Sequence, residues 1–442
     1  MKSINPISSP KKTIRNITLI ALAAIFLIYI VLNIVFWKRG MPELFFEYEI
    51  TEDSSVEIEY CSAPFFLLNV PDTIEGKPVT SIGGLFGNSF LEAGKYNYMK
   101  HYVVAVRLPD TVEEIHYGAF RDCKNLRSIN IPACLKYASS HILSGTKVKE
   151  IVFPEGITEI GCGNDIDFGG YGQCVESFAG MKYLRKVVFP ESLKKIGNNA
   201  FSDCTALKKI TLPDGIEEIK YGAFQNSGLT EANIPKSLVN ISGCIFKGTL
   251  FEETLEKEAS GDFIIFNDVL LYKYIGDDEN VVIPDGIEII CDRAFWTAPN
   301  VKTVEIPERV KFINSAFEYS TVESLVIPDT IDSENDLSFY CCNNLKKIVL
   351  PDNMTKIGDC AFEYCSSLET INIPDNVKTI GYSAFGACRS LKSITIPESV
   401  EEICDNAFSN CISLKEVIIN GSPRIDETAF GNCTALENKP KQ

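Results

Sequence analysis

A 23-residue repeat limits what this chain can fold into more than any other feature of its sequence. Residues 357–379 read IGDCAFEYCSSLETINIPDNVKT, and residues 380–402 read IGYSAFGACRSLKSITIPESVEE. In both copies a Cys stands three residues after an Ala-Phe pair, and an alternation of apolar residues ends in Pro. A fixed period of roughly 20–50 residues is typical of solenoids, in which each repeat buries its apolar face against the next. The sequence therefore predicts one long stack of repeats.

The repeat extends over most of the chain, and the spacing between matching prolines is mostly 21 to 23 residues. These prolines stand at positions 71, 109, 132, 154, 190, 213, 235, 284, 307, 328, 351, 374 and 397. Matching phenylalanines precede most of them by 11 or 12 residues. They are Phe120, Phe178, Phe201, Phe224, Phe295, Phe317, Phe339, Phe362 and Phe385, and the series continues without a proline at Phe408 and Phe430, as the end of a stack would.

A single repeat indicates how the units pack. In residues 391–397, LKSITIP, Ile394 and Ile396 point to one side and the polar residues between them to the other, which predicts a short strand. Pro397 has no N–H to donate to a strand ladder and therefore ends the strand. Ala407 and Phe408 are expected to fill the opposite wall, because the small Ala allows close approach. Each unit is left with an apolar face that only the next unit covers.

The full pattern, L-x-x-I-x-I-P-x-x-V-x-x-I-x-x-x-A-F-x-x-C, resembles the BspA-like leucine-rich-repeat family, as does IEGKPVTSIG at residues 74–83. The resemblance covers roughly residues 45–437. It implies an α/β repeat fold, a right-handed leucine-rich-repeat solenoid with a parallel β-sheet face and an irregular or short-helical opposite wall. It also implies a place on a cell surface and a role in adhesion or host-protein binding, and the family offers no catalytic residues to transfer.

The N-terminus carries a candidate membrane span. Residues 17–37, ITLIALAAIFLIYIVLNIVFW, hold no charge, and as a helix they would measure about 31 Å, enough to cross a bilayer. The segment is apolar all round, whereas a surface helix of a soluble core has one polar face. More Lys and Arg precede it, in the basic segment 1–16, than follow it at Lys38-Arg39, which predicts a cytoplasmic N-terminus and extracellular repeats. A cleaved signal peptide remains the alternative, although the run ends in Val-Phe-Trp and not in the small residues of a cleavage site.

Residues 41–66 are predicted to form an N-terminal cap on the first repeat. Within them, residues 45–60 (FFEYEITEDSSVEIEY) alternate in polarity on both sides of Glu-Asp-Ser-Ser, which is typical of a hairpin. An uncapped solenoid would expose unpaired backbone groups and apolar core. The solenoid itself is expected to cover residues 67–437.

Two insertions are predicted where the period breaks, at about 161–174 and 247–282. The first, GCGNDIDFGGYGQC, is glycine-rich and is interpreted as an exposed loop. Its Asn164, Asp165 and Asp167 lack the spacing and the closing Glu of an EF-hand, so a calcium site is disfavoured. The second contains FIIFNDVLLYKY at residues 263–274, which predicts a hairpin that turns at Asn267-Asp268.

Seven of the sixteen cysteines occupy one position of the repeat, three residues after its Phe. Equivalent positions of adjacent strands lie about 5 Å apart with parallel side chains, whereas a disulfide needs Cβ atoms about 3.8 Å apart that face each other. We therefore expect this ladder to hold reduced thiols, buried as small apolar groups. Among the other cysteines, Cys162 and Cys174 bracket the glycine-rich loop and are the best candidates for a disulfide. The ladder consists of Cys123, Cys204, Cys342, Cys365, Cys388, Cys411 and Cys433.

The composition argues against several classes of function. The net charge of −17 disfavours nucleic acid, whose phosphates require a basic surface. Histidines are few, and the sequence contains no H-E-x-x-H, G-x-S-x-G, phosphate-binding loop or C-x-x-C motif. We therefore predict a protein that is not an enzyme and that needs no metal or cofactor.

The outward side of the strands that precede the prolines is the candidate binding face. Residues four and two positions before each Pro point away from the core, and solenoid sheets offer extended surfaces to ligands. Phe168, Tyr171 and the aromatic residues of the second insertion form an alternative site. The candidate residues of the face are Lys186, Lys209, Thr211, Glu231, Asn233, Thr303, Glu305, Lys347, Thr370, Asn372 and Thr395.

The sequence thus favours a monomeric, membrane-anchored surface protein that binds a protein or glycan ligand. The alternative is a structural envelope protein that spaces other components and has no specific ligand. An acidic surface fits an extracellular domain but does not distinguish the two.

Overall fold

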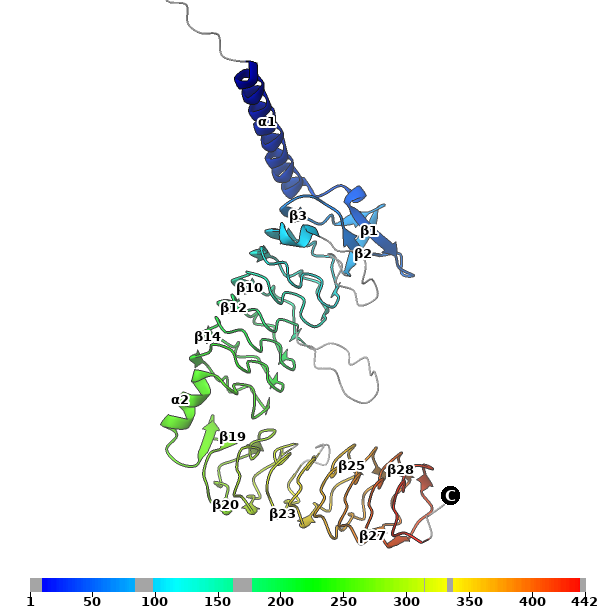
Figure 1. The fold of residues 1–442 in the computed structure, drawn as a ribbon. Helices are drawn as coiled ribbons and strands as arrows, with labels where there is room; N and C mark the ends of the chain where they lie inside the picture. Colours follow the sequence, from blue (N-terminus) through cyan, green and yellow to red (C-terminus); the bar gives the residue numbers. More distant parts are fainter. Residues whose placement is uncertain (1–9, 84–97, 162–176, 314, 332–336, 438–442) are drawn as a thin grey trace, which may run out of the picture. The chain divides into compact units, whose positions relative to one another are not determined.

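The computed structural model describes residues 10–83, 98–161, 177–313, 315–331 and 337–437 (Figure 1). The chain divides into two compact units, Met1–Leu193 with Asn199–Thr211, and Lys194–Asn198 with Leu212–Gln442. Each unit is a stack of turns whose short strands lie side by side in parallel (Figure 1). The predicted leucine-rich-repeat solenoid with a parallel sheet face is therefore confirmed.

The first unit begins with α1 (Pro10–Arg39), followed by the 3-10 turns η1 (Glu43–Phe45) and η2 (Tyr98–His101). Its strands are β1 (Phe46–Ile50), β2 (Val56–Cys61), β3 (Leu67–Asn69), β4 (Thr73–Ile74), β5 (Lys77–Ile82), β6 (Ala105–Arg107), β7 (Glu114–Ile115), β8 (Ser128–Ile129), β9 (Tyr137–Ala138), β10 (Glu150–Val152), β11 (Glu159–Ile160), β12 (Lys186–Val188) and β14 (Lys209–Ile210).

The second unit contains one helix, α2 (Leu250–Glu258), among its described residues. Its strands are β13 (Lys195–Ile196), β15 (Glu218–Ile219), β16 (Glu231–Ala232), β17 (Asn240–Ile241), β18 (Phe263–Phe266), β19 (Leu270–Tyr274), β20 (Asn280–Val282), β21 (Ile289–Ile290), β22 (Thr303–Glu305), β23 (Ser324–Val326), β24 (Lys347–Val349), β25 (Lys356–Ile357), β26 (Thr379–Ile380), β27 (Ser393–Ile396), β28 (Glu402–Ile403), β29 (Glu416–Ile419) and β30 (Arg424–Ile425).

Most repeats add a strand to each of two parallel sheets. The first sheet is formed by the strands that precede the prolines, such as β20-β22-β23-β24 in the second unit. A second sheet, such as β25-β26-β28-β30, is formed by strands that lie about six residues after each proline, and the sequence did not predict it. The wall that was expected to be irregular consists of the turns that carry the Ala-Phe pairs. Equivalent residues of adjacent repeats pair in this sheet, with Ile357 beside Ile380 and Ile380 beside Ile403, and all three are buried.

The predicted cap is a hairpin, with β1 and β2 antiparallel and Phe46 opposite Cys61. β2 then pairs in parallel with β5, so the cap occupies the end of the second sheet of the first unit. This arrangement satisfies the strand edge that an uncapped solenoid would expose.

The repeat phenylalanines form a continuous stack in the core of the second unit. From Phe295 to Phe430, consecutive rings lie 4.9–6.3 Å apart with interplanar angles of at most 18°. All of these rings are buried, as the repeat predicted. The spacing follows the strand separation of about 4.8 Å, because each ring is carried by one turn of the solenoid.

The ladder cysteines are buried thiols and not disulfides, which confirms the prediction. The structure also shows a role that the sequence did not reveal, since six of these thiols donate a hydrogen bond to the carbonyl of the preceding repeat phenylalanine. For example, Cys388 Sγ donates to Phe362 O over 3.2 Å, and Cys365 Sγ donates to Phe339 O over 3.1 Å. Burial raises the pKa of Cys342 to about 12, so that its thiol stays protonated and able to donate.

One position of the repeat, two residues after the Phe, requires a left-handed backbone. Tyr364, Ala387 and Asn410 have φ values of 63°, 57° and 61°. This conformation directs their N–H groups to the carbonyls of the next repeat at 2.7–2.8 Å. Asn tolerates the conformation well, whereas Tyr and Ala adopt it at a cost of about 1–2 kcal/mol. These turns therefore join neighbouring repeats through the backbone itself.

The second insertion contains the predicted hairpin and, before it, a helix that was not predicted. β18 and β19 pair antiparallel on either side of Asn267 and Asp268, both with positive φ. β19 also pairs in parallel with β21, so the hairpin continues the second sheet. The expectations for the first insertion, namely the exposed loop, the calcium ligands, the Cys162–Cys174 disulfide and Phe168 and Tyr171, concern residues outside the described ranges.

Candidate functional site

The candidate binding face lies on the outward side of the first sheet in each unit. Ten of its eleven predicted residues are exposed, and Thr303 is half-buried because it lies against its neighbour on β20. Lys186, Lys209 and Thr211 belong to the first unit and the other eight to the second. The alternation of buried and exposed residues along these strands has the predicted phase, as in β24, where Ile348 is buried between exposed Lys347 and Val349.

The face of the second unit combines polar residues with exposed apolar ones that the candidate set omitted. Val282 and Val326 are 63% and 61% exposed, and Val349, which pairs with Val326 across β23 and β24, is also exposed. Exposed apolar side chains favour binding, because burying a whole valine side chain under a ligand stabilises the complex by about 1.5–3 kcal/mol. Each of these valines stands two residues before a repeat Pro, a position predicted to point outward, and the structure shows that its side chain is exposed.

The face of each unit contains a hollow. On the second unit a hollow of about 350 Å³ lies over β22 and β23, between Thr303, Glu305, Ser324 and Val326. On the first unit a hollow of about 490 Å³ lies over β8 and β10. Its lining includes Ser128, Asn130, Lys149, Glu150 and Val152.

Asn233 is less available to a ligand than the sequence suggested. Its Oδ1 accepts from Leu212 N over 2.7 Å, and its Nδ2 donates to Leu212 O over 2.9 Å. Asn130 makes the same pair of bonds with Leu108 in the first unit. The amide thus completes the backbone hydrogen bonding of the preceding repeat, which is a structural role.

Alternating charges border the face of the second unit. Lys302 Nζ lies 2.5 Å from Glu279 Oε1, Lys346 Nζ 2.6 Å from Glu323 Oε2, and Lys392 Nζ 2.5 Å from Glu369 Oε2. The hydrogen bonds from their lysines lower the pKa of Glu323 and of Glu369. These pairs are exposed and screened by solvent, so they contribute little to stability. They leave the rim of the face polar and close to neutral.

A second candidate surface, the tyrosine row, lies on the turn side of the second unit and was missed by the sequence analysis. The Arg293 guanidinium lies 4.5 Å from the ring centre of Tyr221 and 5.4 Å from that of Tyr319. The row continues from Tyr319 to Tyr340 and Tyr364, whose ring centres are 5.5 and 5.7 Å apart. A cavity of about 600 Å³ adjoins Tyr340. A tyrosine one or two residues after the repeat Phe in successive repeats was the available signal.

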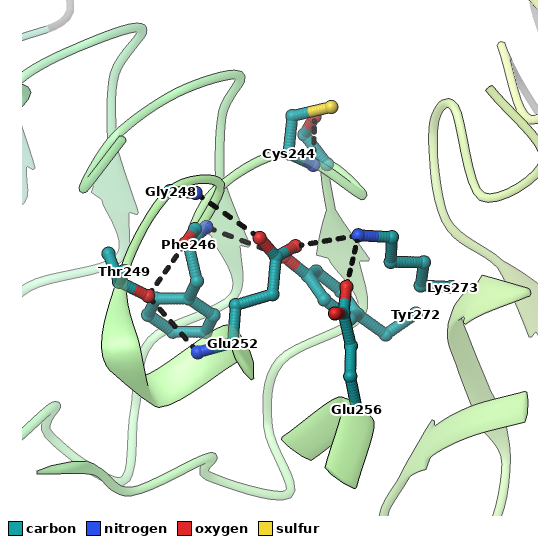
Figure 2. A network of polar contacts seen from close by, with 9 residues as sticks. Cys244, Phe246, Gly248, Thr249, Glu252, Glu256, Tyr272 and Lys273 are labelled. Carbon is teal, nitrogen blue, oxygen red and sulfur yellow. Dashed lines mark hydrogen bonds and ion pairs between the residues drawn. The ribbon is translucent and has the colours of Figure 1, made fainter. Parts of the chain in front are cut away.

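Figure 2 shows a cluster of polar contacts at the second insertion, where α2 meets the hairpin. Thr249 is the N-cap of α2, since its hydroxyl accepts from Glu252 N over 3.1 Å. The Glu252 side chain, buried at 5% exposure, accepts from Tyr272 Oη over 3.2 Å and from Lys273 Nζ over 3.4 Å. Lys273 Nζ also donates to Glu256 over 2.7 Å. Burial lowers the pKa of Lys273, but the contacts with both glutamates outweigh this effect and leave the pKa raised.

This cluster fastens α2 to β19 and does not resemble a catalytic centre. Both Glu252 oxygens are engaged, because Oε2 also accepts from Gly248 N over 3.3 Å. The nearby Cys244 thiol is buried, and burial raises its pKa to about 11, so it is a poor nucleophile at neutral pH. Within the described ranges, no group of three or more His, Cys, Asp or Glu side chains is placed to hold a metal ion.

A family model for the BspA type leucine rich repeat region matches six copies in this chain. The matched residues are 91–163, 175–256, 271–371 and 312–437, more than half of the sequence. The chain belongs to the BspA-type leucine-rich-repeat family. The resemblance stated from the repeat pattern is thereby confirmed.

Solved structures similar to this BspA-type chain include a bacterial cell surface protein. A leucine-rich repeat protein from Bacteroides ovatus is 24% identical, with 88% of this chain and 91% of that chain covered and a TM-score of 0.35. A leucine rich cell surface protein from Faecalibacterium prausnitzii is 22% identical, with 86% and 95% covered and a TM-score of 0.35. The pneumococcal vaccine antigen PcpA is 18% identical, with 86% and 96% covered and a TM-score of 0.37. Likeness at this level supports no statement about a ligand. No curated protein matches the chain.

Proposed function

We propose that this protein is a non-catalytic, membrane-anchored binding protein of the cell surface. It acts as a monomer, with α1 in the membrane, the N-terminus in the cytoplasm and the repeats outside. α1 supports this anchoring, because residues Leu19–Arg39 form a helix that is long and apolar enough to cross a bilayer. The excess of Lys and Arg before it supports the orientation.

The exposed valines on the first-sheet face of the second unit carry the proposal of a ligand. A structural spacer needs only to be soluble, and solubility would be served by polar residues at Val282, Val326 and Val349. Instead these side chains stand among Thr303, Glu305 and the other polar candidates, which is the mixture found in protein interfaces. The ligand of this proposal is accordingly a protein or a glycan that covers β22, β23 and β24.

The test measures binding of the full chain, held in lipid nanodiscs, to purified matrix proteins and cell-wall glycans. Val326→Asp and Val349→Asp place a charge in the proposed contact and are expected to weaken binding about tenfold or more. Val239→Asp is the matched control, since Val239 is also exposed in the second unit but does not belong to the first-sheet face.

A ligand that binds Val326→Asp and Val349→Asp as well as the wild type would place the site elsewhere, with the tyrosine row next in order. Absence of binding to every component tested would instead favour the structural spacer.

A further inference from the structure

The end of α1 is packed onto the N-terminal cap. Tyr29 stacks on Phe65 with ring centres 5.9 Å apart, and its Oη donates to Pro64 O over 2.7 Å. Phe36 meets Phe65 edge to face at 5.2 Å and Phe45 at 6.3 Å. The last three turns of the helix are thus part of the folded cap, and α1 is not a free tether.

Asn33 explains why an apolar helix contains a buried amide. Its side chain is 0% exposed, and its Oδ1 accepts from the backbone N–H groups of Phe66 over 2.9 Å and Leu67 over 3.4 Å. Asn69 completes the joint, since its Nδ2 donates to Trp37 O over 3.0 Å. Without the helix, the Phe66 and Leu67 amides would lose their acceptor, and Phe65 would be exposed to water. These contacts favour a helix that is retained in the mature chain.

The part of α1 that packs on the cap, from Tyr29 onward, limits how far the cap can lie from the membrane. Docking begins at Tyr29, and the uncharged run before it, residues 16–28, amounts to only about 20 Å of helix. The hydrocarbon core of a bilayer is about 30 Å thick. A bilayer that α1 spans must therefore also surround residues of the helix beyond Tyr29. The part of the cap that packs on these residues then contacts the lipid.

The surface of the cap next to the helix suits this position. Residues 61–70, CSAPFFLLNV, contain no charge. Leu44 is 78% exposed and adjoins Phe45, whose ring contacts Phe36 of the helix. Phe66 is partly exposed and contacts Tyr29, and Ile34 and Val35 of the helix are themselves exposed. Tyr and Trp are enriched at the level of the lipid headgroups, and Phe and Leu of interfacial segments are buried at the boundary with the acyl chains. The apolar surface of the cap therefore continues the lipid-facing surface of α1.

We propose that the N-terminal cap is seated in the outer interfacial layer of the membrane and contacts lipid through Leu44, Pro64 and Phe66. α1 and the cap then hold the first repeat directly at the membrane surface. The inference rests on the proposed function in one respect, that α1 is a membrane anchor. It adds a second lipid contact, made by the folded domain itself.

The experiment uses tryptophan quenching in the full chain, reconstituted into vesicles whose lipids are brominated near the headgroup end of the acyl chains. Leu44→Trp and Phe66→Trp are made with Trp37 and Trp296 replaced by Phe, so that each variant has one reporter. Both reporters are expected to lose most of their fluorescence. Val152→Trp, on the exposed face of β10, is the matched control and is expected to lose none.

Three outcomes are distinguishable. Quenching of Leu44→Trp and Phe66→Trp but not of Val152→Trp supports the seated cap. A chain that stays in the membrane with both cap reporters unquenched overturns the inference and leaves the proposed anchor intact. A mature chain that lacks residues 1–37 overturns the anchor as well. If Phe66→Trp does not fold, Leu44→Trp alone still tests the proposal, because Leu44 is exposed and its replacement is not expected to disturb folding.

A second measurement tests the joint itself. Asn33→Leu removes the acceptor of the Phe66 and Leu67 amides and should speed their hydrogen exchange in the full chain, whereas Ile34→Leu, on the exposed side of the helix, should not. Equal exchange rates in both variants and the wild type would show that α1 is not docked on the cap.

Discussion

Replacing Phe362 with Ala tests the core of the second unit most directly. The ring is 1% exposed and lies between Phe339 and Phe385, with both pairs of ring centres 5.2 Å apart. Burial of a Phe side chain contributes about 1.5–3 kcal/mol, and each stacked pair adds about 0.5–1.5 kcal/mol. The expected loss in the free energy of unfolding is therefore about 3–5 kcal/mol, the usual range for Phe→Ala in a core.

Phe430→Ala provides the matched comparison at the end of the stack. Phe430 is also buried, but among the described residues it stacks only on Phe408, at 5.1 Å. One stacked pair fewer should make its replacement less costly by about 0.5–1.5 kcal/mol. The difference isolates the contribution of stacking between repeats from that of burial.

The measurement is urea unfolding of the full chain in detergent, followed by circular dichroism and by hydrogen exchange of individual segments. Contacts in a solenoid are between nearest neighbours, so increased exchange should concentrate in the repeats that carry Phe339, Phe362 and Phe385. Unchanged unfolding of Phe362→Ala would mean that the ring is not buried and that the register of the repeat is wrong.

Three further outcomes follow from buried polar groups. Cys388→Ala should lower the free energy of unfolding by only about 1 kcal/mol. A polar alkylating reagent should modify Cys388 only after unfolding, because burial raises the pKa of its thiol. A Cys365–Cys388 disulfide found by mass spectrometry would contradict this. Glu252→Gln should lower the free energy of unfolding by about 1–3 kcal/mol by weakening the contacts to Lys273, and Lys273→Met added to it should recover part of the loss in a double-mutant cycle. Burial raises the pKa of Asp292 from 3.8 to about 6, so its ionised form opposes folding and stability should increase as the pH falls from about 7 to about 4. Asp292→Asn should therefore stabilise the protein at neutral pH, by up to about 3 kcal/mol, and have little effect near pH 4; equal effects at both pH values would refute this reasoning.

The sequence predicted which residues of the candidate face point outward, but not which of them are engaged in contacts within the fold. The period of two along each strand identified Lys347, Thr370 and Thr395 as outward-facing, because alternation is a property of the strand itself. The outward direction of Val326, two residues before Pro328, followed from the same alternation, and the side chain is exposed. The hydrogen bonds of the Asn233 side chain to the backbone of Leu212 could not be predicted, because Leu212 lies in the preceding repeat.

The sequence by itself determined the solenoid, its register, its buried phenylalanines and its reduced cysteine ladder. These features follow from the period, since any residue that recurs every 23 positions is brought beside its own copy in the next turn. Only the tertiary structure decided what happens where the period fails. The pairing of Glu252 with Lys273 and the docking of Asn33 on the cap join segments that have no equivalent in the repeat. Their partners are set by the path of the chain in space, so no spacing in the sequence records them.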